Sequence, residues 1–65
     1  MTEYSNSQIE KVIDEYIHSS RDREILKRRY IDGITFESLS EEFCLSVRQI
    51  KNIVYKANYT IFKHI

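Results

Sequence analysis

The 65-residue sequence contains no proline and only one glycine, Gly33. Proline interrupts helices and glycine weakens them, so this composition, with 42% hydrophobic residues, favours an all-helical bundle. A single cysteine, Cys44, cannot form an internal disulfide, which is consistent with a reducing compartment. No apolar run approaches the ~20 residues that a membrane-spanning helix needs.

Other sequence signals are also missing. Residues 1–7 carry neither the basic nor the apolar segment of a signal peptide, so we expect none and expect a cytoplasmic protein. Cys44, His18 and His64 lack metal-ligand spacing, and we predict no metal site. Asp14 lies four residues before His18, but such groups at a helix end are more simply capping residues than a catalytic set. We expect no enzymatic activity and no cofactor.

The apolar residues that are present recur at helical spacing. They predict four helices, at residues 7–19, 20–32, 35–43 and 46–63, in one domain of residues 1–65 with residues 1–6 loose. The inward positions of the first three helices would be Ile9, Val12, Ile13, Tyr16, Ile17, Ile25, Leu26, Tyr30, Phe36, Leu39 and Phe43. A chain this short has little core, so all helices must share it or a partner must contribute.

Polar residues mark the predicted helix ends. Ser7 with Glu10 would form a capping box, in which each side chain bonds the other residue's backbone N–H group. Ser19 offers an N-cap for the second helix, and Thr35 offers one for the third. Gly33 follows the second helix, where a left-handed residue ends a helix.

The net charge is zero, but negative and positive segments alternate along the sequence. The balance is −3 over residues 1–20, +3 over 21–31, −4 over 32–45 and +4 over 46–65. The last block has no acidic residue. The distribution of charge matters more for nucleic-acid binding than its sum, although a neutral total indicates modest affinity.

Residues 34–57 have the pattern of a helix-turn-helix, in which the second helix enters the DNA major groove. Ser46 and Gln49 would form the capping box of that second helix. Its inward side would be Val47, Ile50, Ile53, Val54 and Ala57. Its outward side would be Arg48, Gln49, Lys51, Asn52 and Tyr55, which include the side-chain types that reach base edges and phosphates.

Residues 20–62 resemble region 4 of bacterial sigma-70-type factors, the domain that reads the −35 promoter element. The resemblance is carried by residues 23–26 (Arg-Glu-Ile-Leu), 29–37 (Arg-Tyr-Ile-Asp-Gly-Ile-Thr-Phe-Glu), 45–47 (Leu-Ser-Val), 50–51 (Ile-Lys) and 56–57 (Lys-Ala). Cys44 stands where the family often has glycine, and Ser40 where it has a small apolar residue. The chain has nothing resembling the sigma domain that binds polymerase and melts DNA. A free-standing protein of this kind resembles a phage or mobile-element regulator.

The resemblance implies roles for individual residues. Arg29 would contact the DNA backbone, and Thr35 and Glu37 lie where phosphate and base-edge contacts occur. The sequence therefore predicts a transcriptional regulator that binds double-stranded DNA. Its base-reading residues would be Arg48, Gln49, Lys51 and Asn52, and its backbone contacts Arg28, Arg29, Thr35, Glu37, Tyr55 and Lys56. The alternative is a protein-interaction module that binds RNA polymerase or another regulator through the same surface.

Two features of the sequence allow more than one interpretation. Tyr55, Tyr59 and Phe62 are spaced i, i+4, i+7, and this stripe would either pack against the first helix or form a homodimer seam. A dimer would present two reading helices to half-sites one DNA turn apart. Cys44 is expected to be a semi-buried turn residue rather than a reactive thiol.

Overall fold

The computed structural model describes residues 6–64, which form four α-helices and no strand. These are α1 (Asn6–Tyr16), α2 (Ser20–Tyr30), α3 (Phe36–Phe43) and α4 (Val47–His64). The predicted all-α fold with a C-terminal helix-turn-helix and a long last helix is confirmed. No helix in residues 6–64 combines the length and the apolarity needed to cross a membrane.

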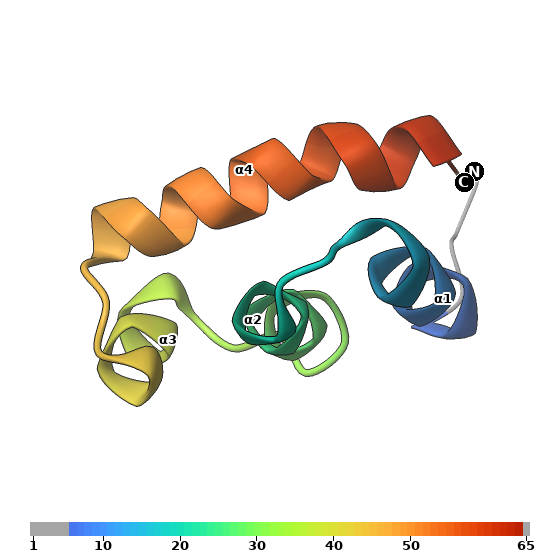
Figure 1. The fold of residues 1–65 in the computed structure, drawn as a ribbon. Coiled ribbons are helices and arrows are strands. Elements are labelled where there is room, and N and C mark those ends of the chain that lie inside the picture. Colours follow the sequence, from blue (N-terminus) through green and yellow to red (C-terminus); the bar gives the residue numbers. More distant parts are fainter. Residues whose placement is uncertain (1–5, 65) are drawn as a thin grey trace.

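The helices pack in two layers. α2 lies in the middle of one layer, with α1 on one side and α3 on the other, and α4 runs across all three (Figure 1). α1 and α3 both contact α2 and α4, but within residues 6–64 they do not contact each other. The N-terminal end of α4 therefore lies over α3 and its C-terminal end over α1, which leaves the far side of α4 uncovered.

The core lies between α4 and the other three helices. Its ten buried side chains are Ile9, Val12, Ile13, Ile25, Leu26, Leu39, Ile50, Val54, Ala57 and Ile61, and among the described residues it includes no polar or charged side chain. Nearly all the predicted inward positions are buried or half-buried. Tyr16 is the exception, because it lies in the last turn of α1 and stacks on His64, with ring centroids 3.8 Å apart and 41% of its surface exposed.

The bounds of α1 differ from the predicted residues 7–19 at both ends of the helix. The helix begins at Asn6, so Ser7 lies inside the first turn and not at the N-cap, and residues 1–5 lie outside the described part. It ends at Tyr16, three residues early, because Ser19 is already the N-cap of α2. The Ser19 hydroxyl accepts from the Asp22 backbone N–H at 3.3 Å.

Two cross-links hold α1 against α2. The Arg23 guanidinium donates to the Ile17 carbonyl at 2.9 Å, which satisfies a backbone group just beyond the end of α1. Lys27 Nζ lies 2.8 Å from a carboxylate oxygen of Asp14. That hydrogen bond to Asp14 is the main reason why the pKa of Lys27 is raised. These contacts fix the angle at which the chain enters α2.

The connection from α2 to α3 follows the predicted chemistry. Gly33 has φ +70°, the left-handed conformation that ends a helix at low cost for glycine. Arg29 Nη1 donates to the Ile34 carbonyl at 3.0 Å, and Arg28 Nε lies 2.8 Å from Glu42 Oε2 of α3. Burial raises the pKa of Tyr30, with Arg29 partly opposing this shift, so the hydroxyl stays neutral at neutral pH.

Candidate nucleic-acid interface

α3, a short turn and α4 form the helix-turn-helix. Thr35 is the N-cap of α3, and its hydroxyl accepts from the Ser38 backbone N–H at 3.2 Å. Cys44 ends α3 in the left-handed conformation, with φ 56° and ψ 40°. The expectation of a semi-buried cysteine is wrong: Cys44 is exposed, because a left-handed residue at a helix end directs its side chain away from the core.

The predicted capping box of α4 is present. Gln49 Oε1 accepts from the Ser46 backbone N–H at 3.0 Å, and the Ser46 hydroxyl accepts from the Gln49 backbone N–H at 3.1 Å. This arrangement limits Gln49 as a reading residue. Paired bonds from a glutamine to adenine need both Oε1 and Nε2, and Oε1 is already used by the cap. Gln49 can therefore present only its Nε2 donor to a base without opening the box.

The outward face of α4 is polar and basic in its first half. Arg48, Lys51, Asn52 and Tyr55 are exposed, and the buried residues of α4 lie on the opposite side, as predicted. Because residues 46–65 include no Asp or Glu, no carboxylate of this helix offsets its cations. An α-helix with its side chains is about 10–12 Å across, which matches the ~12 Å width of the major groove.

One flank of this face centres on the Phe36 ring. The Arg29 guanidinium carbon lies 4.4 Å from its centroid and Lys51 Nζ 6.0 Å, and the Tyr55 ring meets it edge-on at 6.3 Å. Two cations therefore flank the start of α3, where Thr35 lies. Arg29 is half-buried and also bound to the Ile34 carbonyl, so it supports the turn as much as it adds charge.

Two other predicted backbone contacts are less well placed. Arg28 is engaged with Glu42, so its charge is offset between α2 and α3. Glu37 lies exposed in the first turn of α3, where its carboxylate complements the helix dipole but would repel a phosphate. Lys56, in contrast, is exposed on α4 and its charge is well placed for a phosphate.

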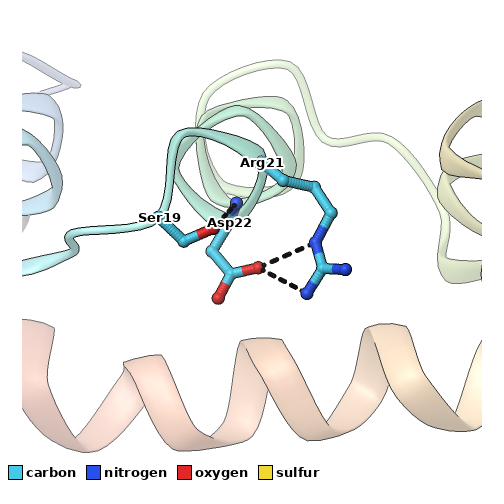
Figure 2. A network of polar contacts seen from close by, with 3 residues as sticks. All are labelled: Ser19, Arg21 and Asp22. Atoms are coloured by element: carbon cyan, nitrogen blue, oxygen red, sulfur yellow. Dashed lines mark hydrogen bonds and ion pairs between the residues drawn. The ribbon is translucent and has the colours of Figure 1, made fainter.

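The other flank is a groove of about 420 Å³ between α4 and the start of α2. It is lined by Tyr16, Ile17, His18, Ser19, Asp22, Leu26, Asn52, Ile53, Lys56, Ala57 and Thr60. Figure 2 shows Arg21 and Asp22 on the side of α2 on which α4 runs. Both Arg21 Nε and Nη2 donate to Asp22 Oδ1 at 3.2 Å. Asp22, the acidic member of this ion pair, therefore lines the same groove as Asn52 and Lys56.

The aromatic stripe does not close the core. Tyr55, Tyr59 and Phe62 are 57%, 72% and 48% exposed, so none of them belongs to the buried core. Ala57 and Ile61 fill that space from the inward side of α4. Lys63 Nζ lies 5.5 Å from the centroid of the Tyr59 ring, so basic and aromatic groups alternate along the outward face. The homodimer seam stays a prediction.

Comparison with known proteins identifies no relative, since no family model, curated protein or solved structure matches the chain. Within residues 6–64 no three His, Cys, Asp or Glu side chains gather where they could hold a metal ion. The candidate site is therefore defined by its own residues: an exposed basic helix face with a charged aromatic flank on one side and a groove on the other.

Sequence reasoning counted Arg21 only within the positive block of residues 21–31 and missed Asp22 as part of this surface. Both lie some 30 residues before Asn52 and Lys56 in the chain, and only the packing of α2 under α4 brings Asp22 to the same groove. The available signal was Ser19, because an N-cap there predicts that the next two or three side chains stand at a helix start.

Proposed function

We propose that this protein is a sequence-specific DNA-binding transcriptional regulator that reads the major groove with α4. The observation that carries the proposal is the outward face of α4, where Arg48, Lys51 and Asn52 are exposed together on a helix without an acidic residue. Lysine and asparagine side chains can discriminate base edges, and arginine can bond guanine with two parallel hydrogen bonds.

The charge distribution supports a modest affinity. Of the four exposed cations on α4, Lys63 lies in the last turn, and Arg48, Lys51 and Lys56 can together neutralise at most about three phosphates. Each phosphate contact contributes about −0.9 to the slope of log affinity against log salt concentration. The expected slope is about −2.7, with roughly a fortyfold loss of affinity between 50 and 200 mM salt. A protein with many phosphate contacts would show a much steeper dependence.

The first experiment is selection of bound sequences from a pool of random duplex DNA at two salt concentrations. We expect an enriched motif at both, and weaker retention at the higher one. A palindrome with half-sites one turn apart would indicate a dimer on DNA, and a single short motif a monomer. Absence of retention even at low salt would contradict the proposal.

Variants then test the residue assignment on the selected motif. Lys51→Ala and Asn52→Ala should cost about 1–3 kcal/mol on that motif and relax preference at particular positions. Lys56→Ala should weaken all sequences alike and reduce the salt slope by about 1. Lys11→Ala is the control, because it removes an equal charge from the exposed face of α1. Equal losses in the three lysine variants, with no loss in Asn52→Ala, would mean that only net charge matters.

The rival proposal is a protein-interaction module that binds RNA polymerase or another regulator. The exposed aromatic rings of Tyr55, Tyr59 and Phe62 favour it, since aromatic residues are enriched at protein interfaces. It predicts capture of polymerase by the parent chain and loss of capture in Tyr59→Ala, with no retention of DNA. Residue 59 is suited to this test because its ring is 72% exposed and the core does not depend on it.

A further inference from the structure

We infer that Asp22 is a built-in competitor of DNA phosphate for Arg21, and that it lowers the affinity of the α4 surface for DNA. The inference rests on the proposed function and names a residue that opposes it. Its basis is the position of the Arg21–Asp22 pair at the groove beside the reading helix (Figure 2).

The geometry places this pair on the flank that a DNA strand would follow. Asn52 and Lys56 of α4 line the same groove as Asp22 and Ser19 of α2. A duplex seated on the outward face of α4 has one phosphate backbone on each side of that helix. Lys56 lines this groove from α4, and Arg21 is tied to it through its ion pair with the groove residue Asp22.

The exposure of the Arg21 and Asp22 side chains determines how each can respond to a nearby phosphate. The Arg21 side chain is 54% exposed and that of Asp22 is 28% exposed, so the guanidinium can turn to solvent while the carboxylate is held at the groove. The Asp22 carboxylate offsets the charge of Arg21 and repels an approaching phosphate. Binding of the backbone requires Arg21 to exchange one oxygen anion, the carboxylate, for another, the phosphate.

The other arginines of α2 do not compete in this way. Arg28 is bound to Glu42 between α2 and α3, Arg23 donates to the Ile17 carbonyl, and Arg29 donates to the Ile34 carbonyl. Exchange of those partners would open a contact that holds helices together. The Arg21–Asp22 pair joins neighbours within the first turn of α2, so breaking it leaves the packing unchanged.

The expected effect is small but measurable. An exposed ion pair contributes little to stability, and its loss to a phosphate changes binding by about two- to fivefold. Asp22→Asn should therefore raise DNA affinity two- to fivefold at low salt, and Arg21→Ala should lower it by a similar factor. The N-cap is retained in Asp22→Asn, because Ser19 bonds the backbone N–H of residue 22.

The test measures affinity for the selected duplex in the parent, Asp22→Asn, Arg21→Ala and the double variant, each with a thermal melt to confirm folding. Glu10→Gln is the charge control, since it removes one exposed acid from α1. We expect a gain in Asp22→Asn that exceeds the gain in Glu10→Gln and shrinks in the Arg21→Ala background.

Three results would overturn the inference. Equal affinities of Asp22→Asn and the parent would show no competition. An equal gain from Glu10→Gln would show that the effect comes from net charge alone. An equal gain from Asp22→Asn in the Arg21→Ala background would show that Arg21 is not involved. In each case a loss of binding in Arg48→Ala would still support DNA binding by α4. If the parent binds no duplex at all, the proposed function itself has failed.

Discussion

At the scale of single residues, the arginines of α2 show how local partners divide one basic cluster into different roles. Arg23 and Arg29 donate to backbone carbonyls at the two ends of α2, whereas Arg21 and Arg28 bind carboxylates. All four are cations in the same positive block of sequence. A guanidinium that satisfies a backbone carbonyl contributes to the fold, and only the pair near α4 remains suited to exchange with a ligand.

Cys44 provides a prediction at this scale. A residue with a Cβ atom in the left-handed conformation carries a steric cost that glycine avoids, and here the side chain is exposed and adds little packing. Cys44→Gly should therefore stabilise the protein by about 0.5–1 kcal/mol in denaturant unfolding. Cys44→Ser keeps the Cβ atom and should leave stability within about 0.5 kcal/mol. A destabilised glycine variant would contradict this reading of the turn.

At the scale of elements, α4 combines three tasks along one helix. Its first turn is held by the Ser46–Gln49 box, its inward side completes the core through Ile50, Val54 and Ile61, and its outward side carries the candidate interface. The start of α4 is where base-reading side chains would lie, so the cap that orders this turn would also order Arg48 and Lys51, the proposed reading residues.

The cap makes a measurable contribution to stability. Ser46→Ala removes the hydroxyl that accepts from the Gln49 backbone N–H and should cost about 1 kcal/mol of unfolding free energy. Ser7→Ala is the matched comparison, because Ser7 lies inside the first turn of α1 and should change stability by less than about 0.5 kcal/mol. Denaturant titrations of both variants would measure the two losses of unfolding free energy. Similar losses in the two would mean that the cap is no more important than an ordinary helical serine.

At the scale of the whole molecule, α2 organises the fold. Like α4, it contacts all three other helices, and its Ile25 and Leu26 are fully buried. A chain of this size has a total stability of only about 3–10 kcal/mol. The loss of one central side chain is therefore a large fraction of what holds the four helices together.

Leu26→Ala tests this dependence. Truncation of a fully buried leucine costs about 2–5 kcal/mol, which should leave a substantial unfolded population at 25 °C by circular dichroism. Tyr59→Ala removes a larger side chain from the outward face of α4 and should change stability by less than about 0.5 kcal/mol. If Tyr59→Ala were as damaging as Leu26→Ala, the stripe would contribute to the fold, for example through self-association at the protein concentration used.

Much of the fold was predictable from the sequence because it depends on contacts within about four residues. The helix order, the caps at Ser19, Thr35 and Ser46, the left-handed Gly33 and the inward positions of each helix are all such features. The end of α1 was misplaced because its stripe continues through Ile17. Beyond Tyr16 the chain is held by Arg23 of the next helix, which a helical period does not reveal.

The sequence by itself determined that this is an all-α chain whose last helix has a basic outward face, because periodicity and charge are properties of neighbouring residues. Only the tertiary structure decided that Tyr59 and Phe62 stay exposed, that Arg28 is bound to Glu42, and that Asp22 stands at the groove beside α4. Those outcomes depend on how helices pack across each other, and packing joins residues far apart in the chain through the shape of the whole core.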